Sequence, residues 1–496
     1  MNTYWGDLHN HCGITYGFGS LDHAIQCAKS QLDFCAFTGH AMWPDMYERT
    51  PETEFVVDFH RKGFQKLQEH WEEIREKIAE ANGADFVTFQ GYELHSREYG
   101  DHHLISSDDD LPLIYRNSPR ELVEDCGKEA IAIPHHIGYT PDYRGIDWKK
   151  FNSAISPVVE VYSKHGCSMS EDADYPYYHN MGPRDTRNMV DEGLRQGHKF
   201  GFVGSTDHHA GFPGSYGDGL AAVVAEERTR ESLWKAIKAR RTYAVTGDRM
   251  ICDFRINDAY LGSEITANSR KIHAHVETEG TLDKLIIYKN LKPFHIINGE
   301  MFQTTNEKGC YKLRVEMGWG NSSLYRWNGN IQVEQGSIED YHTYFRGRNV
   351  LAPSKDETYD ENDVNDIATY SSLKDEKELV WICDTVGNQS TLHPSTASIV
   401  VKVSGDFNTK VTFNLNDKSY TATIGELIHY GYTDHMEYYH SQAFKIFKAL
   451  PESKFLFDLD LEDQQPEQDC DIYHMEVAQK NRQWAYVSPI YVNRTI

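Results

Sequence analysis

Short apolar runs alternate with helix-like patterns through the first 250 residues, and this alternation limits the folds that the chain can adopt. Runs typical of buried strands occupy residues 32–38, 86–90, 130–134, 158–162 and 200–204. Between them, apolar residues recur at helical spacing over 64–78, and helix starts are indicated at Ser118-Pro119 and Thr229. Strands separated by helices usually pair in parallel, so we expect an α/β barrel or a doubly wound sheet.

The pattern changes after about residue 250. The stretches KIHAHVETEG, KLIIYKN and SIVVKVSG alternate in polarity and are separated by Gly, Asn and Asp turns, which predicts antiparallel strands. A chain of 496 residues is also too long for one hydrophobic core. We therefore expect one domain over 1–250 and a mostly β, sandwich-like domain over 251–496. The acidic segment 356–366 is predicted to be a surface loop.

Composition narrows the functional classes. No apolar stretch approaches the roughly 18 residues of a membrane-spanning helix, and MNTYWGDLHNH has no signal-peptide features. The nine scattered cysteines form no CxxC pair, which favours a reducing compartment. We expect a cytoplasmic protein, or a periplasmic or secreted one if a signal was trimmed. The net charge of −25 without a basic cluster argues against nucleic acid and for a small-molecule substrate.

Histidines are concentrated in the first 250 residues, and many follow a predicted strand. His9 and His11 form one pair in GDLHNH, and Asp207 and His209 form another in GSTDHHAG. Side chains two apart on a strand point to one side and can chelate one metal ion. Either pair alone is commonly structural, but the two together with Glu93 in FQGYELH and the run IPHH favour a metal site.

Two further histidines follow the same rule, His40 in FTGHA and His103 in GDHHLI. Neutral imidazoles bind Zn²⁺, Mn²⁺ or Fe²⁺, and carboxylates can bridge two such ions. Ligands gathered at the carboxyl ends of strands are typical of a multinuclear site on a barrel face. The candidate ligands are His9, His11, His40, Glu93, His103, His135, His136, Asp207 and His209.

These motifs carry a family resemblance. GDLHNHCG, FTGHA, GYELH, IPHH and GSTDHH occur in the order of the motifs of the polymerase-and-histidinol-phosphatase (PHP) superfamily. The chain looks most like a branch of uncharacterised bacterial proteins that includes carbaryl-hydrolase-like enzymes, and RRTYAVTGDRM, DFRINDAYLGSE and SPIYV extend the likeness. The resemblance implies an α/β fold, a distorted (β/α)₇ barrel with two or three divalent ions (Zn, Mn or Fe) at its C-terminal face, followed by the β-rich, sandwich-like module.

The resemblance also implies a place for each ligand. His9 and His11 take the first-strand places, His40 that of the usual TDH motif, and Glu93 that of the bridging carboxylate. His103 and His135 take the middle places, with Asp207 and His209 closing the site. The neighbours His102 and His136 compete for the two middle places.

Two departures from the family pattern bear on the number of ions. Gly39 stands where the TDH motif has its aspartate, and Gly17 stands where many relatives carry Asp or His. Asp22 and His23 are candidates to substitute, although their spacing differs. A site for two ions is therefore the simpler expectation.

The expected chemistry is hydrolysis by a water that two ions activate while they polarise the substrate. Candidates to assist the leaving group or hold a substrate anion are His165, Lys164, Arg97, Arg144 and Arg184. Glu160, at a strand end, is a candidate to support a ligand, or else a buried acid bonded to backbone.

Three functions remain open. The first is a phosphoesterase acting on a small phosphate monoester. The second is a hydrolase of carboxylic or carbamate esters or lactones, whose apolar pocket has as candidates Trp43, Trp148, Tyr143 and Tyr162. The third is a non-catalytic, metal-stabilised protein that binds a glycan through Trp319 and Trp327. The sequence does not indicate the oligomeric state.

Overall fold

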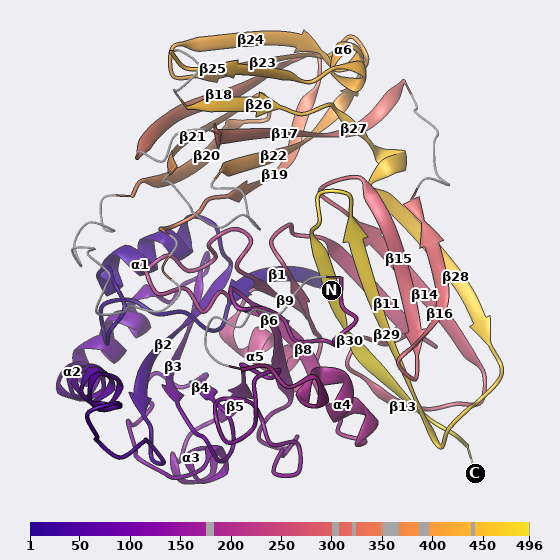
Figure 1. Ribbon diagram of the computed structural model, residues 1–496. Coiled ribbons are helices and arrows are strands. Elements are labelled where there is room, and N and C mark those ends of the chain that lie inside the picture. Colours follow the sequence, from indigo (N-terminus) through magenta and orange to yellow (C-terminus); the bar gives the residue numbers. More distant parts are fainter. Residues whose placement is uncertain are drawn as a thin grey trace.

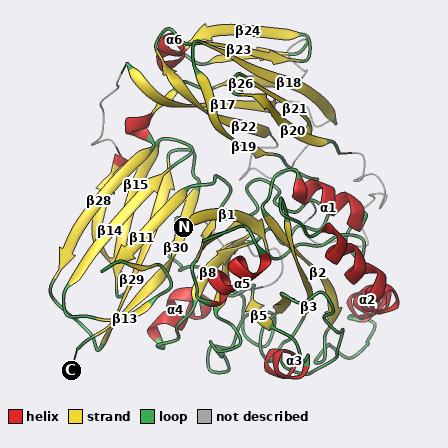
Figure 2. Ribbon diagram, turned by 180° about the vertical axis from the view of Figure 1, so that it is seen from behind, coloured by secondary structure: helices red, strands yellow, loops and turns green. Residues whose placement is uncertain are grey.

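The computed structural model describes residues 1–174, 183–299, 307–319, 324–348, 350, 367–385, 396–437 and 442–495. The predicted loop at 356–366 lies outside these residues. Within them the chain is mostly β-strand, arranged in five sheets with a few helices (Figures 1 and 2). No helix of the described part is long and apolar enough to cross a membrane.

The largest sheet has 12 strands and runs through the lower body of the molecule. Its order is β16 (Lys292–Asn298), β15 (Leu282–Lys289), β29 (Cys470–Gln479), β30 (Trp484–Asn493), β10 (Thr242–Val245), β9 (Leu220–Ala225), β1 (Asn2–Asp7), β2 (Phe34–Met42), β3 (Val87–Leu94), β4 (His102–Ser106) and β5 (Ala130–Pro134), with β13 (Glu264–Thr266) beside β30. Strands from both sides of residue 250 therefore share one sheet. The division into two domains there stays a prediction, and any such division cuts through this sheet.

The expected (β/α)₇ barrel is wrong. Strands β1, β2 and β3 pair in parallel, but β9 pairs antiparallel with β1, and β4 and β5 continue the other edge antiparallel. Only a short loop separates the end of β3 at Leu94 from the start of β4 at His102. A parallel crossover needs a dozen or more residues, so this connection forces a hairpin. The result is an open, mixed sheet in a mostly β protein.

Individual elements of the first half match their predictions better than the fold does. The predicted strand at 130–134 is β5, and those at 158–162 and 200–204 contain β6 (Val158–Ser163) and β8 (Gly201–Gly204) almost whole. Ser118 caps α3 (Pro119–Asp125), and Thr229 caps α5 (Arg230–Lys238), each through its hydroxyl. Local sequence patterns therefore predicted individual strands and helix starts, whereas the overall architecture depends on how the strands pair.

Helices cover the β1–β5 part of the large sheet. On one face, α1 (Leu21–Lys29) and α2 (Glu54–Ala81) pack through an apolar cluster that includes Leu67, Trp71 and Ile74. On the other face lie α5 and a small sheet of β6, β8 and β7 (Gly166–Cys167), around a cluster that includes Phe34 and Trp234. A short helix, α4 (Val190–Arg195), precedes β8. Cover on both faces buries every residue of β2 and β3 and the second half of β1.

Three further sheets come from the second half of the chain (Figure 1). One contains β12 (Ala259–Tyr260), β11 (Ile251–Ile256), β14 (Arg270–Glu277) and β28 (Leu456–Asp463). The second contains β19 (Ser337–Tyr344), β22 (Ala397–Asp406), β17 (Lys308–Trp319), β26 (Ala443–Ile446), β25 (Tyr432–His435) and β27 (Leu450–Pro451). The third contains β20 (Thr369–Asp375), β21 (Glu378–Thr385), β18 (Tyr325–Glu334), β23 (Lys410–Leu415) and β24 (Lys418–Thr423), followed by α6 (Ile424–His429).

The second and third of these sheets form an upper layer around one apolar cluster, which includes Leu313, Trp327 and Trp381. In the sequence this layer lies between β16 and β28, so the chain leaves the lower body and later returns to it. After β19 the chain descends onto the lower body. The amide of Tyr216 donates to the carbonyl of Phe345 (3.0 Å), and Lys164 Nζ donates to that of Val350 (2.9 Å).

Candidate metal centre

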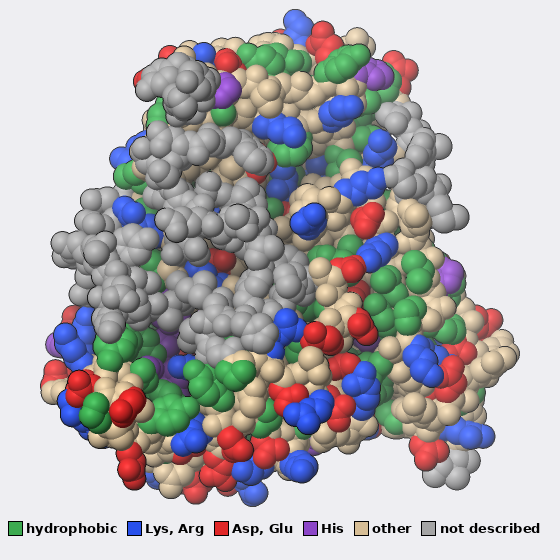
Figure 3. All heavy atoms as spheres, viewed as in Figure 1, with side chains coloured by type: hydrophobic (Ala, Val, Ile, Leu, Met, Phe, Trp, Pro, Cys, Tyr) green, Lys and Arg blue, Asp and Glu red, His purple; other side chains and the backbone are tan. Residues whose placement is uncertain are grey.

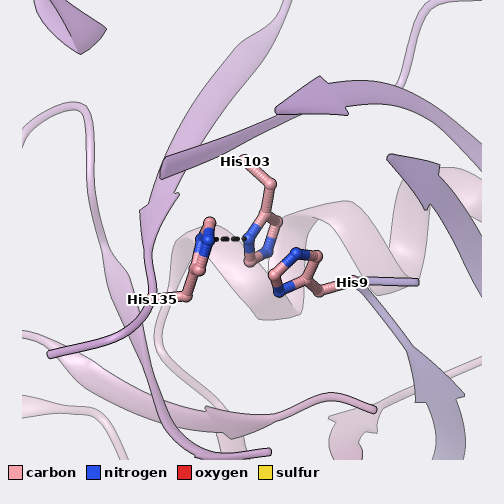
Figure 4. A group of neighbouring side chains, drawn as sticks. All are labelled: His9, His103 and His135. Atoms are coloured by element: carbon pink, nitrogen blue, oxygen red, sulfur yellow. Dashed lines mark hydrogen bonds between the residues drawn. The ribbon is translucent and has the colours of Figure 1, made fainter. Parts of the chain in front are cut away.

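The ends of several strands bring the candidate ligands to one edge of the large sheet. His9 and His11 follow β1, His40 and Glu93 lie near the ends of β2 and β3, and β5 leads into His135. Because β4 is antiparallel, its beginning lies at this same edge, and His103 pairs directly with Glu93. Figure 4 shows His9, His103 and His135 converging from three separate segments.

All nine candidate ligands are buried, and their polar atoms face one another. Three pairs of imidazole nitrogens lie close together: His9 Nε2 and His11 Nε2 at 3.1 Å, His40 Nε2 and His209 Nε2 at 3.2 Å, and His103 Nδ1 and His135 Nδ1 at 3.3 Å. Carboxylates lie between these pairs: Glu93 Oε1 is 3.1 Å from His135 Nε2, and Asp207 Oδ1 is 3.1 Å from His11 Nε2.

These distances fit metal coordination. Two nitrogens held by one ion at about 2.1 Å lie roughly 3.0–3.4 Å apart in octahedral or tetrahedral geometry. Three groups whose ligand atoms all lie within 4.8 Å of one another share this region: His9, His103 and His135; His11, His40 and His209; and His9, His11 and Glu93. Among the described residues, His11 Nδ1 and His103 Nε2 have no hydrogen-bond partner although they are buried, whereas Glu93 Oε2 lies 2.7 Å from His40 Nδ1. Buried polar atoms without partners are costly, and coordination would satisfy them.

Charge states in the cluster also suit a metal ion. Burial opposes ionisation of Glu93 and Asp207, but the surrounding histidines outweigh it and hold the pKa of each carboxyl well below its usual value. Burial, reinforced by neighbouring histidines, holds the pKa of His40, and likewise that of His103 and of His209, well below its usual value. At neutral pH His40, His103 and His209 therefore offer neutral imidazoles, and Glu93 and Asp207 offer charged carboxylates, the forms that bind divalent ions.

His9 differs from the other histidines. Burial disfavours its charged form, yet the carboxylates of Asp207 and Glu160 outweigh burial and raise the pKa of His9 well above its usual value. Its Nδ1 lies 3.0 Å from Glu160 Oε2, and its Nε2 faces the cluster. A proton on His9 therefore balances the negative charge of these carboxylates, and a bound metal ion could balance it instead.

Two of the candidate ligands take an unusual backbone conformation. Asp207 has φ +49° and His136 has φ +55°. Residues other than glycine adopt this left-handed region rarely, and such strain concentrates at functional sites. In this conformation His136 Nε2 lies 3.7 Å from Asp207 Oδ2.

A pocket of about 350 Å³ reaches the cluster from the surface. Its inner end is lined by His40, Glu93, His136, Asp207 and His209, and its walls include Tyr16, Trp43, Phe59 and Arg144. A small molecule that entered this pocket would contact the candidate ligands directly.

Sequence comparisons find relatives without an established activity. Residues 214–281 match the family described as "Protein of unknown function (DUF3604)". An uncharacterized protein of Chlamydia pneumoniae is 28% identical over 258 residues, which are 45% of this chain and 40% of that protein. One of Chlamydia muridarum is 29% identical over 191 residues, 35% of this chain and 30% of that protein. The chain thus spans less than half the length of these curated relatives.

Two solved structures show a weak likeness. One is a two-domain protein of Bacteroides vulgatus containing a predicted PHP-like metal-dependent phosphoesterase, with TM-score 0.33 and 15% identity over 62% of this chain and 81% of that one. The other is a lesion-specific endonuclease of Pyrococcus furiosus, with TM-score 0.29 and 16% identity over 48% of this chain and 56% of that one. Such TM-scores are too low to assign the fold.

Both glycines that distinguish this chain from the motifs it resembles lie in crowded places. A Cβ at Gly17 would lie 2.6 Å from the carbonyl oxygen of Cys12, so no side chain fits there. A Cβ at Gly39 would meet Ile14 and Leu67 at 3.0–3.1 Å, among apolar atoms. The proposed substitutes do not join the cluster: Asp22 pairs with Lys77 on the surface, and His23 contacts Cys27.

The structure shows which histidines of the pairs His102/His103 and His135/His136 face the cluster. His102 Nδ1 bonds to the carbonyl of Gly100 at 2.9 Å, whereas the ring of His103 stacks on that of His9 at 4.4 Å. His103 is therefore the member of its pair that faces the cluster. His135 and His136 both reach it, because His135 contacts Glu93 and His136 contacts Asp207.

The five candidate acid–base or anion-binding residues are placed unequally. His165 Nε2 lies 2.9 Å from Asp207 Oδ2, inside the cluster, and Arg144 lines the pocket with its Nη1 2.9 Å from Asp101 Oδ2. Lys164 instead contacts the descending chain at Val350. The two remaining arginines engage elsewhere: Arg97 bonds to the carbonyl of Asp142, and Arg184 pairs with Glu171.

The aromatic candidates are likewise divided. Trp43 and Tyr143 line the pocket, whereas Trp148 packs on Phe200 in the core and the hydroxyl of Tyr162 donates to the carbonyl of Gly217. Trp327 is fully buried in the upper layer and presents no surface to a sugar. The side chain of Trp319 lies outside the described part.

Sequence reasoning missed a chain of polar residues beside the cluster, two of which, Tyr16 and His95, line the pocket. Tyr16 Oη lies 3.3 Å from His95 Nε2, and His95 Nδ1 lies 3.3 Å from Asp101 Oδ2. His95 also contacts His40 at 3.0 Å and belongs to a ligand-like group with His40 and Glu93. The signal was present, because His95 follows Glu93 by two residues, the same spacing as in the other two pairs.

A second missed residue is Asp7, which ends β1. Its carboxylate accepts hydrogen bonds from the amides of His9, Thr206 and Gly214 and from the Thr206 hydroxyl, at 2.5–3.1 Å. Asp7 thereby joins the two loops that carry the HxH and DxH pairs. The GDLHNH motif contains Asp7, two residues before His9, but the prediction used only the His9–His11 pair.

Proposed function

We propose that this chain is a metal-dependent hydrolase that cleaves a small phosphate monoester. The observation that carries the proposal is a buried cluster of facing imidazole nitrogens and carboxylate oxygens at the inner end of a pocket open to the surface. A purely structural cluster has no need of such a pocket. The substrate is proposed to be a small molecule.

The residues that would hold the ions are those of the three overlapping groups, in which His9 and His11 are each shared by two groups. Divalent ions bound there supply an activated water and polarise the phosphoryl oxygen. Zn, Mn and Fe all suit these ligands, and we propose two or three ions. Glu160 orients His9, and Asp101 holds Arg144 in the pocket wall, where its guanidinium can face a substrate anion.

A second candidate function is hydrolysis of a carboxylic or carbamate ester or a lactone at the same centre. The pocket favours it, because Trp43, Phe55 and Phe59 line its outer part and Arg144 is the only Arg or Lys among the described lining residues. A phosphate monoester carries more negative charge than an ester. Arg144 and the ions must therefore hold that charge if the first proposal is correct.

Metal content and turnover test the proposal together. Protein purified without chelator is analysed by inductively coupled plasma mass spectrometry and assayed with aryl phosphates and the matching aryl esters. We expect two or more equivalents of metal and phosphate release, both lost in His11→Ala and retained in the control His70→Ala, which changes an exposed histidine. Ester turnover without phosphate turnover would establish the second candidate. A chain that takes up no Zn²⁺, Mn²⁺ or Fe²⁺ would contradict both candidate functions and favour a non-catalytic role.

A further inference from the structure

The pocket that reaches the metal cluster has an aromatic outer half. The first two turns of α2 provide Phe55 and Phe59, and the segment after β2 provides Trp43 and Tyr47. Ring centroids lie 5.7 Å apart for Phe55 and Phe59 and 5.7 Å apart for Trp43 and Tyr47. In the space-filling view, histidine atoms are visible between hydrophobic side chains over the region of α2, β2 and β3 (Figure 3).

Aromatic rings continue from this outer half to the candidate ligands. The ring of Phe59 lies 4.6 Å from that of Tyr16, and the ring of Tyr16 stacks on that of His40 at 3.9 Å with an interplanar angle of 12°. A flat group bound along these rings would therefore end beside a candidate metal ligand. Aromatic rings attract one another in such stacked or tilted arrangements beyond the burial of apolar area.

The aromatic rings of Trp43, Tyr47, Phe55 and Phe59 are interspersed with polar side chains among the described residues of the outer half. Arg144 is held by Asp101, and its guanidinium lies 5.6 Å from the ring centroid of Trp43. Among the described lining residues, the other polar side chains of the outer wall are Tyr47, Glu52, Thr53, His60 and Tyr143. A sugar needs several hydrogen-bond partners to offset the loss of water from its hydroxyls, whereas an aromatic ring needs none.

We propose that the pocket selects substrates in which the hydrolysed ester carries an aromatic group. Phe55, Phe59, Trp43 and Tyr47 hold this group, and Arg144 faces the charged end. The proposal rests on the proposed function in that the ester lies at the metal cluster, and it applies whether the ester is a phosphate or a carboxylate. It excludes small sugar phosphates as good substrates.

Two pairs of non-hydrolysable probes test this selectivity on the metal-loaded chain by isothermal titration calorimetry. The first pair is phenylphosphonate and methylphosphonate, and the second is benzoate and acetate. We expect the phenyl member of at least one pair to bind about ten-fold or more tightly than its methyl partner, since burying a ring in such a pocket is worth at least about 1.4 kcal/mol.

Variants then assign the preference to the pocket wall. In Phe55→Ala/Phe59→Ala, the affinity for the phenyl probe should fall about ten-fold while that for the methyl probe stays unchanged, which also shows that the variant is folded. Phe294→Ala is the matched control, because Phe294 is 39% exposed on β16 and Phe55 is 40% exposed. It should leave both affinities unchanged.

The outcomes separate the two proposals. Equal binding of phenyl and methyl probes in both pairs, or a preference that survives in Phe55→Ala/Phe59→Ala, would overturn the aromatic selectivity while leaving the hydrolase proposal intact. Preference within the carboxylate pair, with neither phosphonate binding, would support the aromatic pocket and count against a phosphoesterase.

Discussion

The Nδ1 atom of His9 lies 3.0 Å from Oε2 of Glu160, so a carboxylate on β6 orients an imidazole that follows β1. Both side chains are almost fully buried. Carboxylates in this position fix the ring of a ligating histidine and raise its basicity. The small sheet that contains β6 thus positions a candidate ligand at the edge of the large sheet through one hydrogen bond.

The first prediction concerns this pair. Glu160→Gln should lower metal affinity about 10- to 100-fold, because the ring of His9 loses its charged partner. Competition with a chelator of known affinity measures the change. Asp458→Asn is the control, since Asp458 Oδ1 lies 2.7 Å from His275 Nδ1 in a similar pair far along the chain. Equal affinities in Glu160→Gln and the unaltered chain would show that Glu160 does not support a ligand.

The second prediction concerns Asp7. Asp7→Asn replaces one carboxylate oxygen with an NH₂ group that must face a backbone amide, so either the bonds from the His9 and Thr206 amides to Oδ1 or those from the Thr206 hydroxyl and the Gly214 amide to Oδ2 are lost. We expect the free energy of unfolding to fall by about 2–4 kcal/mol, as for one or two hydrogen bonds to a buried charged group. Urea denaturation measures it. Asp22→Asn, an exposed acid on α1, should change it by less than about 0.5 kcal/mol, and a similar small loss in Asp7→Asn would contradict the prediction.

The third prediction concerns pH and His60. Burial, with nearby charges, lowers the pKa of His60 to about 3, and its Nδ1 bonds to the carbonyl of Val56. The unfolded chain titrates this residue near 6.5, so below that pH only the unfolded state takes up the proton. Stability is therefore full above about pH 6.5 and falls as pH decreases toward 3, by up to about 1.4 kcal/mol per pH unit for each such histidine.

His60→Asn tests this dependence while keeping a donor for the Val56 carbonyl. In chelator-treated protein, urea denaturation between pH 5 and 6.5 should show a slope smaller by about one proton than that of the unaltered chain. His70→Asn, at an exposed position on α2, should leave the slope unchanged. An unchanged slope in His60→Asn would mean that the histidine is protonated in the folded state.

The fourth prediction concerns the contact between the upper layer and the lower body. Arg314 on β17 places Nη2 2.7 Å from Asp248 Oδ2, and Tyr216, Gln479 and Asn481 also donate to this buried carboxylate. Arg314→Met should cost about 3–5 kcal/mol, because it leaves a buried charge without its cation. Arg314→Met/Asp248→Asn should recover part of the loss in thermal denaturation.

The control for that pair is Arg120→Met, which removes an exposed pair with Glu124 and should cost less than about 1 kcal/mol. If Arg314→Met were no more destabilising than Arg120→Met, the pair would not hold the layers together. The double variant separates loss of the cation from loss of packing, since only the former is relieved by neutralising Asp248.

Sequence reasoning grouped the candidate ligands better than it predicted the fold. The HxH and DxH spacings depend only on two-residue periodicity, and His9, His11, Asp207 and His209 do lie together. The barrel failed because parallel pairing was inferred from helices between strands, whereas the short β3–β4 loop and the late strand β30 decide the pairing. Neither is visible in hydrophobic periodicity.

The pocket was beyond prediction for a related reason. Phe55 and Phe59 lie before the apolar stripe of α2 that sequence reasoning used, and only tertiary packing brings them opposite Trp43. Trp148 and Tyr162 are aromatic residues of the same kind as Trp43 and Tyr143, yet they are buried in the core and do not line the pocket. The sequence around an aromatic residue does not show whether its side chain will pack in the core or line a pocket.

The central position of β30 in the large sheet has a consequence for biosynthesis. Tyr243 on β10 pairs with Val487, so β10 has no neighbour on that side while the intervening chain, including the whole upper layer, is being translated. Contacts this distant in sequence form late and slowly. A nascent chain therefore exposes the unpaired edge of β10 during the second half of its synthesis, and a chaperone that covered this edge would prevent its pairing with other chains.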